Sequence, residues 1–289
     1  MAGPQTFLIL ITGHNVRPFL SGLVESLARL RYGRWRALFV DDCSSDGTLA
    51  ALRSLLDHHK VNARFEIIVN SEQRFKAHNI FHALQGRGTR DDVVVMLDGD
   101  DQLAVDNALD RLAFEYDAGW EIVWSNWRGS DGSRGTSSHL NPFLSPRQQA
   151  FVTSHLFSFR RHLFDAVIEH DLQDDDGQWF QAGCDVALAW PLLDQTIKRK
   201  HIEDVLYIYN RANPQSHDKM GAAARPLVSQ TQSQTSALLS RRKGKALTID
   251  NEFLHVHLYE LLHAAASSAR ETTRQQIAWT LQAPGRRTT

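Results

Sequence analysis

Short apolar runs alternate with helical patterns over the first hundred residues, and this alternation constrains the fold more than any other feature of the chain. Four of the runs have the length of strands, at 7–12, 37–40, 65–69 and 93–97. Between them, apolar residues recur at helical spacing, at 18–33, 46–58 and 76–85. Such an alternation predicts an α/β fold with a mostly parallel sheet flanked by helices.

The second half of the chain has a less regular pattern. We expect strands at 121–125 and 201–209 and a helix at 157–168. The stretch 221–240 is rich in Ala, Ser, Gln and Thr, which is typical of a linker or a poorly packed helix. A last helix follows, and we expect its apolar side chains to share one face: Phe253, Leu254, Leu258, Leu261, Leu262 and Ala265.

Composition and charge exclude several classes of protein. Hydrophobic residues make up 42% of the 289 residues, which is typical of a globular protein and not of a disordered one. The formal net charge of -1 argues against a protein that wraps nucleic acid. Two cysteines, Cys43 and Cys184, are too few for a disulfide framework. The apolar run 7–11 is far shorter than the roughly 20 residues that span a bilayer, so we expect a soluble, cytoplasmic protein.

Polar side chains cluster where three of the expected strands end, at 12–15, 41–47 and 98–101. In open parallel sheets, ligands bind at the carboxyl ends of the strands. Alternate residues of an extended segment share a side, so Asp98 and Asp100 point into one site and Asp101 points away. Such carboxylates suit Mg²⁺ or Mn²⁺, which also binds phosphate oxygens, so a nucleotide diphosphate is a natural ligand. Taken alone, the acidic residues are also compatible with a turn or a helix cap.

The same segments carry a resemblance to a known family. They are Leu10-Ile11-Thr12-Gly13-His14-Asn15, Val40-Asp41-Asp42-Cys43-Ser44-Ser45-Asp46-Gly47-Thr48, Asn70 with 76–83, and Leu97-Asp98-Gly99-Asp100-Asp101. In this order they resemble the family 2 glycosyltransferases with the GT-A fold, over about residues 6–217 and most strongly before 105. The resemblance implies a GT-A fold, with a Rossmann-like, mostly parallel central sheet flanked by helices and a C-terminal helical extension.

The resemblance implies a donor-binding role for several residues. Thr12, Asn15 and Asp42 match positions that contact the nucleotide, Asp42 by accepting a hydrogen bond from the base. Lys76 and Arg211 match basic positions near the diphosphate. Lys76 is equally compatible with an ordinary lysine at the start of a helix.

The resemblance also implies a metal site and a catalytic base. Asp98 would face the ribose and the metal, Asp100 would ligate the Mn²⁺ or Mg²⁺ that bridges the phosphates, and His217 would reach the metal or close over the phosphates. Asp185 matches the catalytic base, although Cys184 stands where many members have Glu. A surface histidine and a capping carboxylate are the plain alternatives for His217 and Asp185.

The function implied is metal-dependent, inverting transfer of a sugar from a nucleotide-diphosphate sugar to an acceptor hydroxyl. A UDP-sugar is the expected donor, and a carbohydrate or glycoconjugate, as in surface polysaccharide synthesis, is the expected acceptor. We expect a catalytic domain at 1–220, with a donor half at 1–101 and an acceptor half at 102–220, and a linker and helical extension at 221–289.

Two other functions are alternatives. One is a non-catalytic nucleotide-sugar-binding protein on the same scaffold. The other is a sugar-nucleotide pyrophosphorylase, because the stretch 86–90 is Gly-rich, but it precedes the fourth strand and does not follow the first. The apolar face of the last helix is expected to dock on the catalytic domain or on a second subunit. The basic run 241–245 is expected to be a solvated linker or to contact an anionic membrane surface peripherally.

Overall fold

The computed structural model describes residues 4–214, 237–240, 242, 244, 247 and 250–282, and side chains as far as residue 274. Within this part, eight strands form one sheet. The strands are β1 (Phe7–Gly13), β2 (Trp35–Asp41), β3 (Phe65–Val69), β4 (Val93–Asp98), β5 (Gln102–Leu103), β6 (Ile122–Gly129), β7 (Ser158–Arg160) and β8 (Arg199–Tyr209). Their order across the sheet is β3-β2-β1-β4-β7-β6-β8-β5.

Most neighbouring strands of the sheet run parallel. β1 pairs in parallel with β2 and with β4, β2 pairs in parallel with β3, and β6 pairs in parallel with β8. β7 is antiparallel to β4 on one side and to β6 on the other, and β5 is antiparallel to β8. The α/β class expected from the sequence is therefore confirmed.

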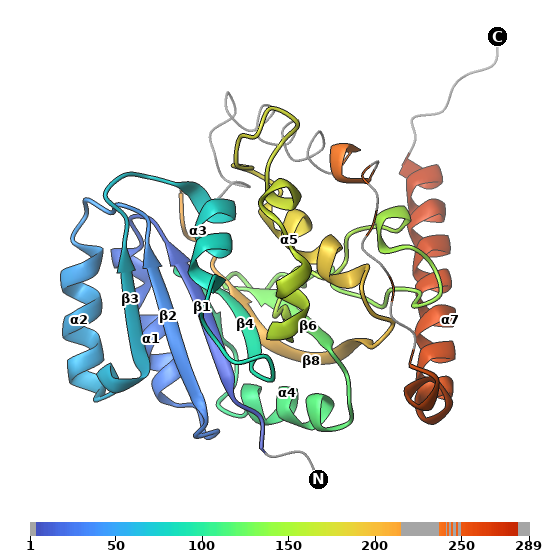
Figure 1. The fold of residues 1–289 in the computed structure, drawn as a ribbon, viewed down its shortest axis with the longest axis horizontal. Helices are drawn as coiled ribbons and strands as arrows, with labels where there is room; N and C mark the ends of the chain where they lie inside the picture. Colours follow the sequence, from blue (N-terminus) through green and yellow to red (C-terminus); the bar gives the residue numbers. More distant parts are fainter. Residues whose placement is uncertain are drawn as a thin grey trace.

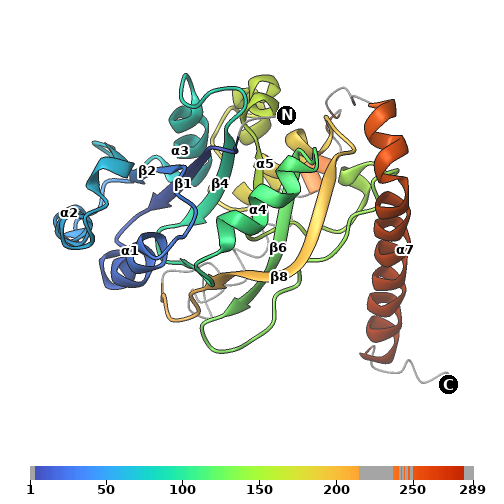
Figure 2. The same cartoon turned by 90° about the horizontal axis from the view of Figure 1, so that it is seen from below.

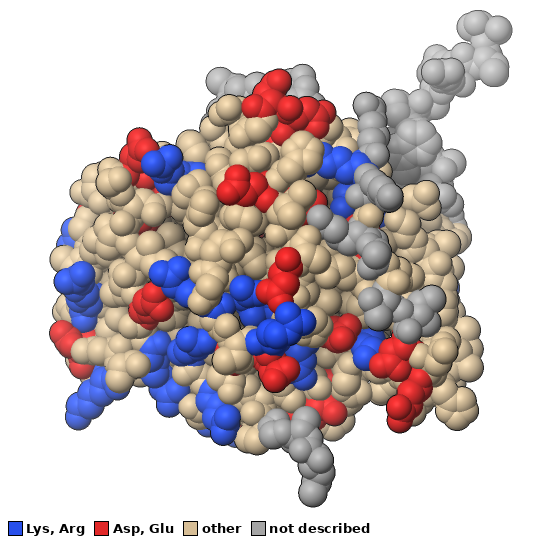
Figure 3. Space-filling view, in the orientation of Figure 1, with Lys and Arg blue, Asp and Glu red and all other residues tan. Residues whose placement is uncertain are grey.

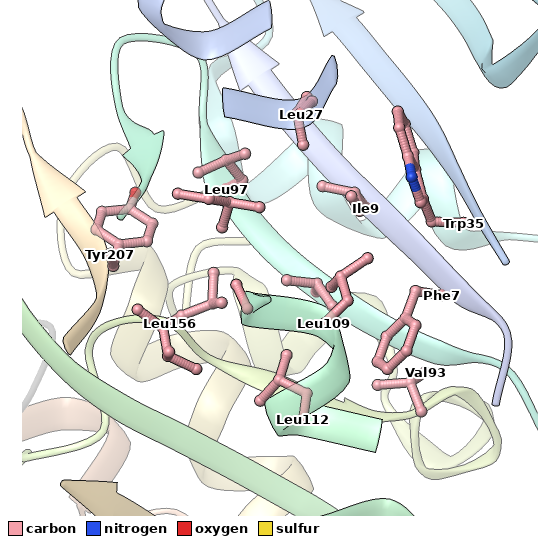
Figure 4. Packing of buried hydrophobic residues seen from close by; sticks show 14 of the residues in the cluster. Phe7, Ile9, Leu27, Trp35, Val93, Leu97, Leu109, Leu112, Leu156 and Tyr207 are labelled. Atoms are coloured by element: carbon pink, nitrogen blue, oxygen red, sulfur yellow. The ribbon is translucent and has the colours of Figure 1, made fainter. Parts of the chain in front are cut away.

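Helices cover both faces of the sheet (Figures 1 and 2). They are α1 (Leu20–Ala28), α2 (Thr48–His59), α3 (Phe75–Leu84), α4 (Ala108–Asp117), α5 (Cys184–Leu193) and α7 (Asn251–Gln282). One buried cluster joins α1, α2 and α4 to one face of the sheet, and a second joins α3 and α5 to the other face. Figure 4 shows the first cluster, in which Leu109 and Leu112 of α4 meet Phe7 and Ile9 of β1.

Strand residues alternate between these two clusters, as the pleat of a strand requires. Phe7, Ile9 and Ile11 of β1 belong to the first cluster, while Leu8 and Leu10 belong to the second. All of them are 3% exposed or less. A strand buried on both faces is apolar at every position, and this explains the unbroken apolar runs of β1 and β4.

The helix expected at 157–168 is wrong. The segment forms the short strand β7 and then a 3-10 helix, η4 (Arg161–Ala166). Ser158 is fully buried, and its hydroxyl donates to the carbonyl of Val123 and accepts from the hydroxyl of Tyr116. β7 fills the gap between β4 and β6, so its conformation is set by partners far away in the chain and not by local spacing.

Basic and acidic side chains are interspersed on the face of the molecule shown in Figure 3. This mixture agrees with the formal net charge of -1. No helix in the described ranges is both long and apolar enough to cross a bilayer.

α7 lies at the edge of the molecule and packs through one narrow stripe (Figures 1 and 2). Phe253 is 7% exposed and Leu261 is fully buried. The ring of Phe253 meets that of Trp120 edge-on, at 5.0 Å between centroids. Leu258 and Leu262, expected on the same face, are 45% and 54% exposed, so that part of the expectation is wrong. Side chains four residues apart lie on the same side of a helix, so Phe253 and Leu261 share the buried side. Leu258 and Leu262 point away from it.

Phe253→Ala is expected to destabilise the protein by about 3 kcal/mol, because it removes a buried aromatic ring and leaves a cavity against Trp120. Tyr259, which is 82% exposed on the same helix, provides the matched control. Tyr259→Ala is expected to change the free energy of unfolding by less than about 0.5 kcal/mol. Denaturant titration of both variants measures the difference, and equal effects would contradict docking of α7 through the Phe253 stripe.

Candidate active site

The carboxyl ends of β1, β2 and β4 bring the predicted donor-site residues to one edge of the sheet. Thr12 is paired in register with Asp98, and Gly13 is paired with Asp41. The amide of Gly99 donates to the carbonyl of Thr12 at 2.9 Å. Neighbouring parallel strands thus place Thr12, Asp42 and the Asp98 turn side by side, as the sequence predicts.

Lys76 joins the two halves of the site. It lies in the first turn of α3, and its Nζ is 2.8 Å from Asp98 Oδ1 and 2.8 Å from Asp185 Oδ1. Burial alone would lower the pKa of Lys76, but the charges of Asp185 and Asp98 outweigh it and hold the pKa well above its ordinary value. The lysine is therefore a permanent cation between the predicted base and the predicted metal ligand.

Asp185 is positioned by the start of α5. Gly183 precedes the helix with φ 73°, a left-handed conformation that favours glycine, and Asp185 lies in the first turn. Its side chain is 43% exposed. The helix amino terminus favours a negative charge at this point. Asp185 is therefore a reachable carboxylate held against Lys76.

Cys184 is a buried, uncharged neighbour of Asp185. Its thiol donates to the carbonyl of Phe180 at 3.2 Å, and burial raises its pKa to about 12. The resemblance implies a glutamate at this position, and the thiol carries no such negative charge. The segment is helical in the structure, with Asp185 in its first turn.

The last two aspartates of the Asp98–Asp101 turn have different surroundings, although β4 ends at Asp98 and the following residues form a turn in place of the extended segment expected. Asp101 is fully buried and accepts hydrogen bonds from the hydroxyl of Tyr207 at 2.5 Å and from the amide of Asn210 at 2.6 Å. Asp100 Oδ2 instead accepts from Asn213 Nδ2 at 2.7 Å. Asp101 therefore anchors the end of β8 to the turn, whereas Asp98 contacts Lys76 and Asp100 contacts Asn213.

Asp98 and Asp100 fit a divalent cation that is shared with a ligand. Within the described ranges, no group of three or more His, Cys, Asp or Glu side chains has the spacing of a complete metal site. Two carboxylates suffice for Mg²⁺ or Mn²⁺ when phosphate oxygens and water complete the shell. Burial, and then the charge of Asp98, raise the pKa of Asp100. A cation shared by the two carboxylates would relieve this repulsion.

Asp42 is a buried anchor for the loop that leads into α3. It is 4% exposed, and it accepts hydrogen bonds from Asn70 Nδ2 and from the amides of Arg74 and Phe75 at 2.8 to 2.9 Å. Phe75 has φ 66°, which is strained for a residue with a side chain. Burial would raise the pKa of Asp42, but the hydrogen bonds outweigh it and lower the pKa. The carboxylate thereby stabilises the turn that presents Lys76.

Asp42→Asn is expected to destabilise the protein by about 2 kcal/mol at neutral pH, because a hydrogen-bonded buried carboxylate is lost. The pKa of Asp42 is lower in the folded state than its ordinary value of 3.8, so its stabilisation is present above that pH. It is lost as the pH falls towards the folded pKa. Denaturation measured from pH 7 to 3 is therefore expected to show a shallower acid loss in the Asn variant, and parallel curves would contradict this role.

A model of the family described as "Glycosyl transferase family 2" matches residues 8–174, which is more than half of the chain. The chain belongs to glycosyl transferase family 2. A curated relative is the putative teichuronic acid biosynthesis glycosyltransferase TuaG of Bacillus subtilis (strain 168), with 27% identity over 109 residues. That match spans 37% of this chain and 40% of TuaG, which is less than half of the relative's length.

Solved structures share the fold of this chain. S. aureus TarS 1-349 in complex with UDP is similar with a TM-score of 0.53 and 15% identity, over 88% of this chain and 72% of that chain. The mannosyltransferase PcManGT from Pyrobaculum calidifontis, in complex with GDP-Man and Mn²⁺, gives a TM-score of 0.57 and 18% identity, over 98% and 84%. The GT-A architecture expected from the sequence is thereby confirmed.

Three further predicted residues of the glycosyltransferase lie outside the contacts already described. Asn15 braces the neighbouring loop, since its Oδ1 accepts from the amide of Ser45 at 2.8 Å. Arg211 follows β8, and its guanidinium lies 5.7 Å from the ring centroid of Tyr209. His217 lies outside the described residues. Roles of Asn15, Arg211 and His217 in binding the donor or the metal stay predictions.

The Gly-rich stretch 86–90 lies away from the site. It follows α3 and leads into the amino end of β4, while Asp98 lies at the carboxyl end of the same strand. Gly88 packs against the side chain of Arg161, and Thr89 bonds the carboxylate of Asp92. This stretch is a structural turn at the opposite edge of the sheet, so it gives no support to the pyrophosphorylase alternative.

A group of ring side chains lies beside the acidic turn, and sequence reasoning missed its histidine. The rings are those of Trp127 of β6, His155 of the segment before β7, and Tyr207 and Tyr209 of β8. The ring of His155 stacks on Tyr207 with 4.5 Å between centroids and an interplanar angle of 12°. Tyr207 and Tyr209 are two residues apart in a strand and so share a face, which was a signal available in the sequence. For His155 the sequence contains no such signal.

Proposed function

We propose that this glycosyltransferase moves a sugar from a nucleotide-diphosphate sugar to an acceptor hydroxyl with inversion, in a reaction that depends on Mn²⁺ or Mg²⁺. One observation carries the proposal. Lys76 Nζ lies 2.8 Å from both Asp98 and Asp185, so the groups suited to hold the leaving diphosphate and to accept the acceptor proton flank one cation. A site with both functions within reach of one anomeric carbon is what direct displacement needs.

The donor is expected to lie along the edge formed by β1, β2 and β4. Thr12, paired with Asp98 in the sheet, and the loop held by Asp42 would face the nucleotide, and Asp98 and Asp100 would face the diphosphate. Asp98 and Asp100 would hold a divalent cation, which would supply positive charge to the departing diphosphate. Lys76 adds a second positive charge at the same position.

Asp185 acts as the base in this mechanism. Its carboxylate takes the proton of the acceptor hydroxyl as that oxygen forms a bond to the anomeric carbon. The bond from the anomeric carbon to the diphosphate oxygen breaks, and its electron pair leaves with the diphosphate. Attack opposite the leaving group inverts the configuration, and a single carboxylate suffices because no covalent intermediate forms.

The proteins with similar folds support the choice of donor class. TarS has been solved with UDP and with UDP-GlcNAc, and PcManGT with GDP-Man and Mn²⁺. TuaG is named for teichuronic acid biosynthesis. We therefore infer a UDP-sugar donor and an acceptor among surface polysaccharides or glycoconjugates. We also infer that residues 1–220 carry catalysis, with the donor half at 1–101 and the acceptor half at 102–220.

Thermal stabilisation tests this function most directly. UDP, GDP, UDP-GlcNAc, UDP-glucose and GDP-mannose are each added with Mn²⁺ and with EDTA. A nucleotide sugar that raises the melting temperature with Mn²⁺ but not with EDTA supports the proposal. Sugar release to water with the same donor separates an enzyme from a binding protein. The proposal would be overturned if none of these nucleotides raised the melting temperature.

A further inference from the structure

His155 lies among three aromatic rings next to the acidic turn, and they fix the plane of its own ring. The ring stacks on Tyr207 at 4.5 Å and 12°, and on Tyr209 at 5.6 Å and 20°. Trp127 meets it edge-on at 5.6 Å and 87°. Three aromatic contacts leave the imidazole little freedom to rotate, so the directions of its two ring nitrogens are set by the fold.

Tyr207, on which His155 stacks, is itself immobilised by the acidic turn. Its hydroxyl donates to Asp101 Oδ2 at 2.5 Å and accepts from the amide of Asp98 at 3.3 Å. Figure 4 shows its ring at the margin of the core, near Leu97 and Leu156. The imidazole of His155 is thereby held at a fixed position relative to Asp98.

The charged groups that act on His155 are those of the active site. Burial is the main cause that lowers its pKa, and the charges that act on it are Asp185 and Asp98, which raise it, and Lys76, which lowers it. His155 thus lies within range of both the predicted base and the predicted metal ligand. The lowered pKa keeps the imidazole neutral near pH 7.

Within the described residues, neither ring nitrogen of His155 has a hydrogen-bond partner, and the residue is half-buried. A neutral imidazole offers one donor and one acceptor, which is the pair that a sugar hydroxyl can satisfy.

We propose that His155 recognises a hydroxyl of the sugar being transferred and thereby helps to select the donor sugar. This inference rests on the proposed function. The anomeric carbon must lie between the diphosphate, held at Asp98 and Asp100, and the attacking hydroxyl, held at Asp185. A side chain that lies near Asp98 and near Asp185 is therefore beside the sugar ring and not beside the nucleotide base.

Two substitutions separate hydrogen bonding from packing. His155→Phe retains a planar ring for the stack on Tyr207 and removes both polar atoms, whereas His155→Gln retains a donor and an acceptor. His58→Phe, at an exposed histidine near the end of α2, is the matched control. Circular dichroism and the melting temperature of each variant establish that it is folded.

The measurements are the affinity for UDP alone and kcat/KM for the preferred nucleotide sugar and for its epimer at one hydroxyl, for example UDP-glucose and UDP-galactose. We expect His155→Phe to bind UDP as the unmodified protein does and to lose about tenfold in kcat/KM for the preferred sugar. The preference between the epimers is expected to shrink by a similar factor. His155→Gln is expected to recover part of the loss, and His58→Phe to change nothing.

Each other outcome has a distinct meaning. An unchanged preference between the epimers in an active His155→Phe variant would overturn the role in sugar recognition and leave the proposed function intact. An equal loss of affinity for UDP alone would assign His155 to the nucleotide or to the packing of the turn, and would also overturn it. Absence of nucleotide-sugar binding by the unmodified protein would instead refute the proposed function.

Discussion

Asp185→Asn is expected to lower the rate of transfer by about 10² to 10⁴, the range that general-base catalysis contributes. The amide has almost the shape of the carboxylate but cannot accept the proton of the acceptor hydroxyl. Its oxygen can still accept a hydrogen bond from Lys76, which lies 2.8 Å from Asp185 Oδ1, so the start of α5 is expected to stay in place. The loss is therefore expected in kcat, with the affinity for UDP nearly unchanged.

Steady-state kinetics and titration calorimetry with UDP measure the two quantities separately. Asp176→Asn is the matched control, because Asp176 is an exposed aspartate in the loop before α5. This control is expected to transfer sugar at the unmodified rate. A kcat within about twofold of the unmodified enzyme for Asp185→Asn would remove Asp185 as the base.

Asp100→Asn is expected to reduce transfer by about 100-fold and to abolish the effect of Mn²⁺ on donor binding. The substitution removes one of the two carboxylates of the acidic turn. The amide that replaces it keeps an oxygen for the hydrogen bond from Asn213 Nδ2, which is 2.7 Å long in the structure. The fold of the turn is expected to persist, since Asp101 and Tyr207 hold it from below.

The readout for Asp100→Asn is the affinity for UDP measured with Mn²⁺ and with EDTA. In the unmodified protein the two affinities are expected to differ, and in the variant they are expected to converge. The same pair of titrations on Asp176→Asn controls for a general effect of charge. Activity of Asp100→Asn that equals that of the unmodified enzyme, or an unmodified enzyme fully active in EDTA, would contradict the metal-dependent mechanism.

Much of the arrangement at the carboxyl ends of β1, β2 and β4 could be predicted, because parallel strands bring these ends together. Thr12 and Asp98 are far apart in the chain but are paired in register in the sheet. Apolar runs identify β1 and β4 from the sequence, and adjacency then follows from the fold class. Asp101 is buried against Tyr207, but a turn after Asp98 determines this and not the strand alternation expected from the sequence.

Other features could not be predicted, because long-range contacts determine them. β7 has only three residues, and its antiparallel partners are residues 93–95 and 122–123. Three residues are too few to show a strand period, and the flanking positions resemble a helix. His155 comes shortly before this strand, so its stack on Tyr207 depends on the same pairing.

The sequence by itself determined the fold class, the family and the acidic turn. The fold class follows from the local periodicity of apolar residues, and the other two follow from short motifs. Only the tertiary structure decided that Lys76 lies between Asp98 and Asp185. Asp185 is 109 positions after Lys76 in the chain. The tertiary structure also decided which face of α7 is buried and where His155 lies. The physical reason is that contacts between distant segments depend on how the sheet and helices pack, and no local pattern of residues encodes that packing.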